Sequence, residues 1–415
     1  MPCDHQISAR AYVYSRIFIH KLYIQRGLNG DITLSISKIQ QNQICNRCIL
    51  PSSYPRIHFD NEGVCSICRE YDQWSQKREF ELLNKQKLLE KICTEARNKK
   101  KEFDALVPLS GGKDSTYVLY VARKKLGLRC LAYTLDTGYL SDHAKRNVEN
   151  TCKILGVEHL YYRFDPELMN KLFGLFIKKT GWFCSVCMRA IAMTTSLMAD
   201  LYRVPLIITG TSLSTELPLS REMIQLGTVD HVRNVLKGES IVSESERLLI
   251  SNSLRRKIGY LLFLLSKKRH LRTYAWFNLS EYVEWNYDII LNTIREELNW
   301  TSPSEAEHMD CIIHPLQKYI LDRRFPGSEM ERLTLARLIM AGQISREEAL
   351  RKLEKSSSQC PELVMKLFLN NIKMSKEEFD KYIDMGPRHL QFNSKPGLIS
   401  KLRMKVFPHK EAGTY

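Results

Sequence analysis

The sequence predicts an α/β fold in which a parallel sheet carries helices on both faces, with a small cysteine-rich ribbon before it and a mostly helical region after it. Between residues 103 and 230, short apolar runs alternate with amphipathic stretches, a pattern typical of strands and helices in a parallel sheet. Two Cys-x2-Cys pairs precede this alternation, within residues 45–70. Residues 231–415 have a helical pattern rich in Lys, Arg and Glu. Ligands of such a sheet are expected at the carboxyl ends of its strands.

The alternating segment divides into four strands and the helices between them. Apolar runs predict strands at residues 105–109, 129–135, 158–164 and 205–209. Helical spacing predicts helices over 115–126, over 142–155 with Gly156 as its end, and over a long stretch that reaches Ala199. Residues 71–102 are charged, with helical apolar spacing, and predict a connecting helix or pair of helices. Residues 1–44 carry no interpretable motif and form an N-terminal extension of unknown role.

Length and composition indicate a folded protein of two or three domains. The chain has 415 residues, of which 44% are hydrophobic and 26% charged, and these values exclude a small disulfide scaffold and wholesale disorder. Its formal net charge of +16 favours anionic partners such as nucleotides, RNA or acidic lipid surfaces, without choosing among them. No transmembrane segment is expected, because the basic-flanked apolar run at 258–265 falls short of the roughly 20 residues that span a bilayer.

The twelve cysteines have a spacing that indicates metal binding. By chance, about a third of one Cys-x2-Cys pair is expected in the whole chain. The chain has three such pairs, at Cys45/Cys48, Cys65/Cys68 and Cys184/Cys187. No secretory signal opens the sequence, because charged residues interrupt its first apolar stretch. The thiols therefore indicate a cytoplasmic protein whose cysteines bind metal rather than form disulfides.

The sharpest local motif is Ser-Gly-Gly-Lys-Asp-Ser at residues 110–115, between a predicted strand and a predicted helix. Gly111 and Gly112 let the backbone bend so that successive N–H groups point into one concavity, and the start of the helix adds partial positive charge. A pyrophosphate group fits such a site. An isolated Gly-Gly pair would more simply be a turn that starts a helix, but the flanking strand, helix and serines favour phosphate binding.

Each polar side chain of this loop has an expected role. Ser110 and Ser115 can donate hydroxyl hydrogen bonds to phosphate oxygens. Asp114 cannot favourably face a bare phosphate and is better explained as a ligand or orienter of Mg²⁺. Lys113 contacts phosphate or is simply solvated. Lys113, Asp114 and Ser115 are therefore the candidate catalytic residues.

This loop resembles the SGG-x-D-S loop of the PP-loop ATP pyrophosphatases, whose domains are of the adenine nucleotide alpha hydrolase type. The resemblance implies that ATP is cleaved between its α and β phosphates, that AMP is transferred to a substrate oxygen, and that pyrophosphate is released. It also implies a nucleotide contact at Asp136, where the next predicted strand ends. As a residue type, Asp136 is equally suited to form a turn.

The first two cysteine pairs match the spacing of a four-thiolate zinc ribbon, with sixteen residues between Cys48 and Cys65. A unit this small has little core, so the metal would supply its folding energy. The four ligands would be Cys45, Cys48, Cys65 and Cys68, which leave no open coordination position. We therefore expect bound Zn²⁺ to be structural rather than catalytic.

Ribbon and loop together resemble the N-acetyl sugar amidotransferase family of surface-polysaccharide biosynthesis. The resemblance is carried by residues 45–51 (Cys-Asn-Arg-Cys-Ile-Leu-Pro), by residues 55–68, and by the loop about forty residues later, with a weaker likeness at residues 344–349. It implies that AMP is placed on the acetamido oxygen of an N-acetylated nucleotide sugar, and that ammonia displaces it. The ammonia would come from a glutaminase partner, because the sequence has no recognisable glutaminase centre.

The third pair, Cys184 and Cys187, departs from that resemblance. It lies at the apparent start of a helix, where thiolates are stabilised, and is similar to the Cys-x2-Cys pair of PP-loop tRNA thiolation enzymes. This similarity implies a [4Fe-4S] cluster with Cys311 as the third thiolate and one iron left open. A zinc site closed by His308 or His314 is a second interpretation. Buried apolar cysteines are a third.

The leading hypothesis is ATP- and Mg²⁺-dependent adenylylation of an amide oxygen, followed by its replacement with ammonia-derived nitrogen. One alternative is sulfur transfer to a tRNA base or a small molecule through an iron–sulfur cluster. Another is a non-catalytic zinc-ribbon module that only binds a nucleotide. Trp276, Trp285 and Trp300 offer rings that a base can stack on, but helical core packing is the favoured interpretation.

Overall fold

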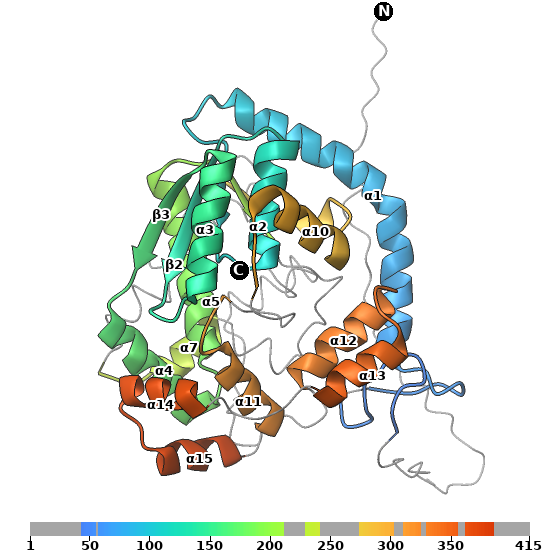
Figure 1. Cartoon of the computed structure of the whole chain (residues 1–415), viewed down its shortest axis with the longest axis vertical. Helices are drawn as coiled ribbons and strands as arrows, with labels where there is room; N and C mark the ends of the chain where they lie inside the picture. The colour runs from blue at the N-terminus through green and yellow to red at the C-terminus, as the bar shows by residue number, and fades with distance from the viewer. Residues whose placement is uncertain are drawn as a thin grey trace, which may run out of the picture. The chain divides into compact units, whose positions relative to one another are not determined.

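The computed structural model describes residues 43–54, 57–210, 229–240, 274–302, 310–324, 329–355 and 362–385. All of them belong to one compact unit, Asn42–Lys395. Nearly the whole predicted N-terminal extension, together with His308, lies outside the described residues. Figure 1 shows the arrangement of the described elements.

A parallel sheet of five strands organises this unit, in the order β3-β2-β1-β4-β5. The strands are β1 (Ala105–Pro108), β2 (Cys130–Asp136), β3 (Glu158–Arg163), β4 (Leu206–Thr209) and β5 (Ala275–Asn278). The chain moves outward from β1 to β3 and then returns to the other side of β1 to form β4. The order therefore reverses between β1 and β4, and in open α/β sheets ligands bind beyond the carboxyl ends of the strands at such a point.

Helices connect and cover the strands. They are α1 (Ser66–Asn98), α2 (Lys113–Tyr120), which continues as a π-helical turn (Val121–Lys125), α3 (Asp142–Leu155), α4 (Pro166–Thr180), α5 (Cys184–Leu201), α7 (Val229–Leu236), α10 (Tyr287–Leu298), α11 (His314–Arg324), α12 (Met330–Met340), α13 (Arg346–Lys355), α14 (Glu362–Ile372) and α15 (Lys376–Asp384). A short 3-10 turn, Leu279–Glu281, follows β5.

Local signals explain where several of these helices begin and end. The Ser141 side chain caps α3 by accepting a hydrogen bond from the N–H of Ala144. Gly156 ends α3 with a φ of 59°, in the left-handed region that glycine adopts readily. Gly181 ends α4 in the same way, with a φ of 69°. The long helical stretch predicted up to Ala199 is therefore two helices, α4 and α5.

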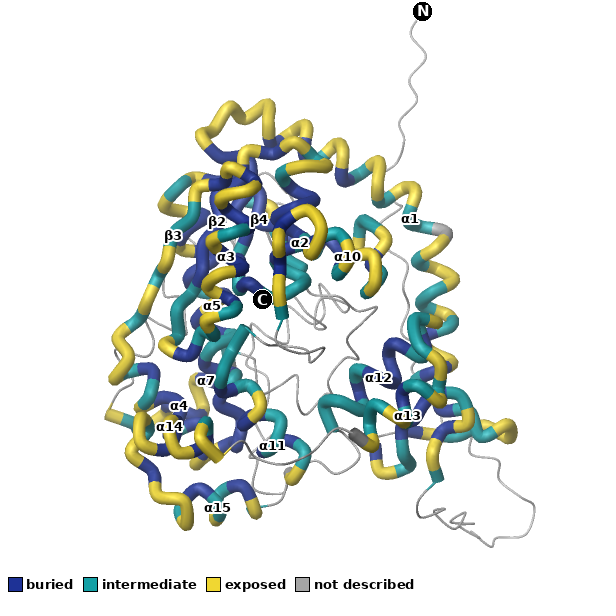
Figure 2. Tube along the Cα trace, viewed as in Figure 1, coloured by how far each residue is buried: buried dark blue, intermediate teal, exposed yellow. Residues whose placement is uncertain are grey.

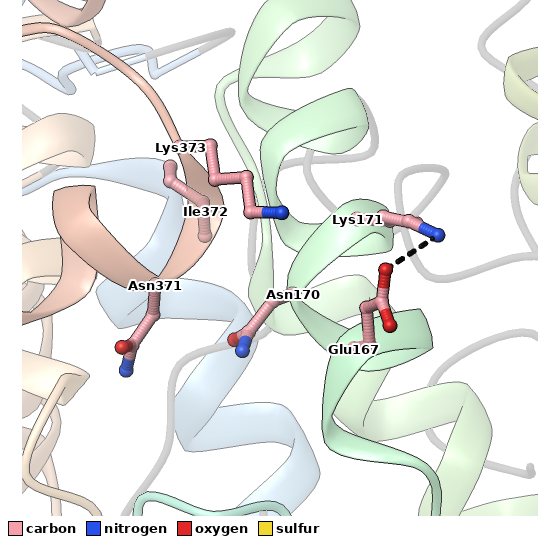
Figure 3. Close-up of a pocket in the computed structure, with 6 residues that line it drawn as sticks. All are labelled: Glu167, Asn170, Lys171, Asn371, Ile372 and Lys373. Atoms are coloured by element: carbon pink, nitrogen blue, oxygen red, sulfur yellow. Dashed lines mark ion pairs between the residues drawn. The ribbon is translucent and has the colours of Figure 1, made fainter.

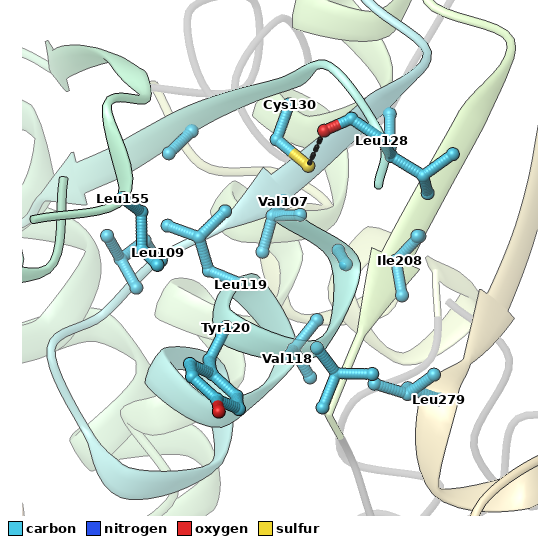
Figure 4. Packing of buried hydrophobic residues seen from close by; sticks show 14 of the residues in the cluster. Val107, Leu109, Val118, Leu119, Tyr120, Leu128, Cys130, Leu155, Ile208 and Leu279 are labelled. Atoms are coloured by element: carbon cyan, nitrogen blue, oxygen red, sulfur yellow. Dashed lines mark hydrogen bonds between the residues drawn. The ribbon is translucent and has the colours of Figure 1, made fainter. Parts of the chain in front are cut away.

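Alternate strand residues pack into two cores, one on each face of the sheet. Val107 of β1 and Leu109, which directly follows β1, share a core with α2, α3 and α10 (Figure 4). Leu106 of β1 and Ile207 of β4 belong to the opposite core, which Met198 and Ala199 of α5 complete. Because successive side chains of a strand point to opposite faces, both faces must be apolar and covered. The predicted fold class, a parallel sheet with helices on both faces, is confirmed.

The strand β5 was not predicted, because it has four residues and lies within the region expected to be mostly helical. Among the described strands it occupies the edge of the sheet and pairs with β4. A strand this short carries too little periodicity to be distinguished in a sequence. Trp285 and Trp300 are buried in the core beside α2, in agreement with the expected core packing, whereas Trp276 lies on β5 and is only half-buried.

The helix α1 links two separate cores. Its 33 residues extend about 50 Å at 1.5 Å per residue. Near its start, Tyr71 and Trp74 pack with the cysteine ribbon, α12 and α13. Near its end, Leu89 and Cys93 join the core of the sheet, and the intervening surface includes many exposed residues (Figure 2). In the part of the chain that the structure describes, no helix is both long and apolar enough to cross a membrane.

Candidate active site and cysteine clusters

The predicted phosphate loop connects β1 to α2 beside the switch point of the sheet. Gly111 has a φ of +80°, in the left-handed region. A Cβ atom at this position would lie 2.3 Å from the carbonyl oxygen of Ala144 on α3. Glycine is therefore required here both by the backbone conformation and by the close approach of α3. Gly112 is the N-cap residue of α2, and no side chain caps that helix.

Both serines of the motif face one another within the loop. Their Oγ atoms lie 3.1 Å apart, and the Ser110 N–H donates to Ser115 Oγ, also at 3.1 Å. Ser115 Oγ donates to the carbonyl oxygen of Gly112 at 3.2 Å, and the Gly112 N–H donates to Ser110 Oγ at 3.3 Å. The hydroxyl groups are thus held at the N-terminus of α2, where the helix contributes partial positive charge.

Lys113 and Asp114, the charged pair of the motif, contact each other, but one carboxylate oxygen of Asp114 has no hydrogen-bond partner among the described residues. Lys113 Nζ lies 2.7 Å from Asp114 Oδ2 and 5.4 Å from the ring centroid of Tyr287. The other carboxylate oxygen, Asp114 Oδ1, is buried and has no hydrogen-bond partner among the described residues. Burying such an atom unpartnered is unfavourable. The oxygen fits the ligand position of a hard cation such as Mg²⁺.

Asp136 lies at the end of β2, as predicted, but its carboxylate has local partners. Its Oδ1 accepts a hydrogen bond from the Gly138 N–H at 2.8 Å, and its Oδ2 lies 3.8 Å from Arg163 Nε. The first contact is the local bond of an aspartate turn. A nucleotide contact at Asp136 stays a prediction.

An aspartate that the sequence did not indicate lies beside the loop. A Cβ atom on Gly112 would lie 3.6 Å from Asp310 Oδ2. The main chain holds Asp310 there, because its carbonyl oxygen accepts a hydrogen bond from the Ser141 N–H at 2.9 Å. In the sequence, its position next to Cys311 was the only sign that Asp310 lies near a functional site.

Cys311 approaches the other two cysteines of the predicted site from a distant part of the chain. It pairs in antiparallel fashion with Leu140, beyond the end of β2. Cys184 and Cys187 occupy the first turn of α5, and all three cysteines are half-buried against the same core. Besides burial, the neighbouring Cys187 and Cys311 thiols raise the pKa of Cys184, Cys311 raises that of Cys187, and Asp310 raises the pKa of Cys184 and Cys311.

Burial is the main reason that the pKa of each of these thiols rises, and it takes the pKa of Cys311 to about 12. This differs from the expected stabilisation of thiolates at the helix start, because desolvation of the charged form outweighs the helix terminus. The three sulfur atoms do not lie within 4.8 Å of one another, and within the described ranges His314 joins no such group.

The four ribbon cysteines form a closed cluster. Their sulfur atoms all lie within 4.8 Å of one another, and all four residues are fully buried. Cys45 Sγ is 3.9 Å from Cys68 Sγ, and Cys48 Sγ is 3.7 Å from Cys65 Sγ. In a tetrahedral site with metal–sulfur bonds of about 2.3 Å, neighbouring sulfurs are about 3.8 Å apart. The predicted ligand set therefore fits one tetrahedrally bound ion.

Side chains from the C-terminal helices support the ribbon. Arg346 of α13 donates from Nε to the carbonyl oxygen of Cys48 at 3.2 Å. Arg332 of α12 donates to the carbonyl oxygen of Ile49 at 3.0 Å. The buried ribbon cysteines share one apolar core with Leu333 and Ala336 of α12. Ribbon and helices thus form a single packed module.

One pocket lies apart from these sites, between α4 and the end of α14 (Figure 3). It has a volume of about 260 Å³ and is lined by Glu167, Asn170, Lys171, Asn371, Ile372 and Lys373. Lys171 forms an ion pair with Glu167 at 3.0 Å. Asn170 and Asn371 are both hydrogen-bonded to the Tyr139 hydroxyl. The pocket contains none of the residues predicted from the sequence.

Residues 280–405 match a family model described as the C-terminal domain of WbpG-like LPS biosynthesis proteins. The C-terminal part of the chain is thus WbpG-like. This domain includes α10 to α15 and supplies Asp310, Cys311 and the two arginines that support the ribbon. The match agrees with the resemblance to a family of surface-polysaccharide biosynthesis.

The chain is also similar to one protein in sequence and to two solved structures. The uncharacterized protein MJ1599 of Methanocaldococcus jannaschii is 26% identical over 186 residues, which are 44% of this chain and 62% of that protein. The U34-tRNA thiolase NcsA from Methanococcus maripaludis, with its [4Fe-4S] cluster, has a TM-score of 0.31 and 16% identity, over 66% of this chain and 82% of the thiolase. The NH3-dependent NAD synthetase from Campylobacter jejuni has a TM-score of 0.26 and 16% identity, over 54% of this chain and 99% of the synthetase.

Proposed function

We propose that this chain is an AMP-forming enzyme of the PP-loop type. In this proposal it adenylylates the amide oxygen of an N-acetylated nucleotide sugar, and ammonia-derived nitrogen then replaces that oxygen. The observation that carries the proposal is the glycine loop at the switch point of the sheet, with its facing serines and an Asp114 oxygen that has no partner within the described structure. The WbpG-like domain supports a polysaccharide precursor as the substrate.

The loop would bind the pyrophosphate part of ATP. The backbone N–H groups at the start of α2 and the hydroxyls of Ser110 and Ser115 are positioned before the reaction begins. Negative charge grows on pyrophosphate as it leaves, and donors that are already oriented stabilise that charge without reorganisation. Mg²⁺ bound at Asp114 would neutralise part of the phosphate charge. Lys113, held by Asp114, adds a positive charge at the same place.

The reaction proceeds through two balanced steps. First, the amide oxygen attacks the α-phosphorus, a new P–O bond forms, and the bond from the α-phosphorus to the bridging oxygen breaks, which releases pyrophosphate. Second, ammonia attacks the amide carbon and loses a proton, and the C–O bond breaks to release AMP and leave an amidine. The amide oxygen therefore leaves with AMP. We expect this reaction in the cytoplasm, with a glutaminase partner as the source of ammonia.

Pure protein, ATP, Mg²⁺, ammonium and candidate acetamido nucleotide sugars are expected to yield AMP and pyrophosphate. Ammonium in solution replaces the glutaminase partner, so the chain can be assayed alone. A substrate labelled with ¹⁸O in the acetamido group is expected to transfer the label to AMP, which mass spectrometry measures. A reaction without the sugar is the control. Formation of ADP, or unlabelled AMP, would contradict the mechanism. Tight ATP binding without turnover would instead indicate the non-catalytic module.

The arrangement of three other cysteines favours a second candidate, sulfur transfer to a tRNA base or a small molecule. Cys184, Cys187 and Cys311 meet near the loop. Asp310 lies beside Cys184 and Cys311 and also beside Gly112 of the loop. Among the described residues the three cysteines do not form a close group of ligand atoms like that of the ribbon, and in a cluster each thiolate would bind a different iron. Such a cluster would supply an open iron that can hold sulfur.

Metal analysis separates the two candidates. The amidotransferase proposal predicts a colourless protein, purified without oxygen, that holds about one zinc per chain at the ribbon and no iron. Iron and acid-labile sulfide in comparable amounts, with visible absorbance, would favour the sulfur transferase. The Cys187→Ser variant is the matched control, because only a cluster at this site would lose its iron on this substitution. The zinc content is expected to be the same in both proteins.

A further inference from the structure

The carbonyl oxygen of Gly111 accepts hydrogen bonds from two side chains that the proposed mechanism does not use. Trp300 Nε1 donates at 2.9 Å and Asn147 Nδ2 donates at 3.2 Å. Both donors are buried, with 8% of Trp300 and 2% of Asn147 exposed. Trp300 follows α10 in the WbpG-like domain and Asn147 is on α3, so two distant segments meet at one peptide of the loop.

Asn147 also holds Trp300 in place. Its Nδ2 donates to the carbonyl oxygen of Thr301 at 2.8 Å, and its Oδ1 accepts from the Thr301 N–H at 3.0 Å. Trp300 is further fixed by its backbone N–H, which donates to the carbonyl oxygen of Ile294, one turn before the end of α10. The two donors therefore form one hydrogen-bonded unit around the Gly111 carbonyl group.

Fixing this carbonyl group also fixes the N–H group of the next residue. In a trans peptide the C=O and N–H bonds point in opposite directions. Because the Gly111 carbonyl oxygen faces Trp300 and Asn147, the Gly112 N–H faces away from them, toward Ser110 Oγ at 3.3 Å. Two successive glycines would otherwise permit this peptide to rotate. A rotated peptide would present its carbonyl oxygen, which repels phosphate, where its N–H should be.

We propose that Trp300 and Asn147 are positioning residues of the nucleotide site, which hold the Gly111–Gly112 peptide with its N–H on the side of Ser110 Oγ, where the pyrophosphate part of ATP would bind. This inference rests on the proposed function of the loop. It assigns a part of the nucleotide site to the WbpG-like domain, because the donor of the shorter of the two hydrogen bonds comes from that domain. Neither residue touches ATP itself.

The Trp300→Phe variant tests this role, because it removes the N–H donor and keeps an aromatic ring. Trp285→Phe is the matched control. Trp285 is 3% exposed and lies in the same core, and its Nε1 is buried without a hydrogen-bond partner among the described residues. Both variants lose an indole N–H and similar packing, but only Trp300→Phe loses a bond to the loop. Calorimetric titration with ATP, pyrophosphate and AMP then measures three affinities for each protein.

The affinity of Trp300→Phe for ATP and for pyrophosphate is expected to fall about threefold to tenfold, as for one lost hydrogen bond. Its affinity for AMP is expected to stay within twofold, because AMP lacks the pyrophosphate that the Gly112 N–H would face. Trp285→Phe is expected to bind all three as the unaltered protein does. A general loss of packing would not separate pyrophosphate from AMP.

Any other result contradicts either the proposed function or the positioning role. If the unaltered protein binds neither ATP nor pyrophosphate, the proposed function itself fails. If it binds both and Trp300→Phe matches Trp285→Phe, the positioning role is wrong and the proposed function stands. An equal loss for AMP and ATP also contradicts the positioning role. If Trp300→Phe does not fold, as shown by its melting curve, Asn147→Ala replaces it. Its control is Thr151→Ala, one turn later on α3, where the buried hydroxyl has no partner in the described structure.

Discussion

The Asp114→Asn variant is expected to form AMP roughly 10²–10³-fold more slowly than the unaltered protein. The substitution keeps the shape of the side chain but removes the charge from the buried oxygen that has no partner among the described residues. It also takes the ion-pair partner from Lys113. The measurement is the initial rate of AMP formation at saturating ATP and several Mg²⁺ concentrations.

Asp142→Asn provides the matched control for this variant. Asp142 is an acidic residue in the first turn of α3, as Asp114 is in the first turn of α2, but its side chain is exposed and pairs with Lys145 at 3.2 Å. We expect its rate to stay close to that of the unaltered protein. Equal rates for the two variants would contradict a role of Asp114 in the reaction. The zinc content of Asp114→Asn should be normal, because the ribbon is a separate site.

Replacing Cys48 by Ser is expected to remove the metal from the ribbon and to loosen α12 and α13 together with it. Metal binding in small thiolate sites contributes about 10–16 kcal/mol, whereas whole domains are stable by about 5–15 kcal/mol. The helices would lose a packed neighbour, because Arg346 binds the Cys48 carbonyl group and the ribbon shares their core. The measurements are zinc content and the rate of proteolysis within α12 and α13.

Cys152→Ser is the control for the ribbon variant, since Cys152 is also buried but lies on α3 in the core of the sheet. Its zinc content and its proteolysis at α12 and α13 are expected to be normal. Full zinc content in Cys48→Ser would show that the ribbon is not the metal site. We also expect weaker ATP binding in Cys48→Ser, because the loosened helices α12 and α13 are linked to the loop through one residue between them. Gln343, between α12 and α13, accepts a hydrogen bond from the N–H of Tyr287, and the ring of Tyr287 lies near Lys113.

The elements that the sequence predicted correctly are those with a local cause. Ser141 and Gly156 mark the ends of α3, and a run of apolar residues marks β1. The loop was recognisable because its glycines and serines are consecutive, and the ribbon because each cysteine pair has a fixed spacing. The strand β5 was missed, since only its pairing with β4 makes its four residues a strand.

The supporting side chains of the site depend on contacts between distant segments. Nothing near Trp300 or Asn147 in the sequence indicates that both donate to Gly111. Asp310 had no signal of its own, and a β-type pairing with the segment after β2 brings it to the loop. The raised pKa of Cys184 has a similar cause, because burial depends on neighbours that its own helix does not reveal.

By itself, the sequence determined the succession of strands and helices along the chain on either side of the loop. It also determined the four ribbon thiols and the type of ligand that each local motif suits. These depend on backbone preferences and on residues a few positions apart. The tertiary structure alone decided which carboxylate oxygen of the loop is buried without a partner among the described residues, which side chains hold the loop peptide, and how the WbpG-like helices support the ribbon. Hydrogen bonds and desolvation arise wherever two segments come into contact, and no local pattern of residues encodes which segments those are.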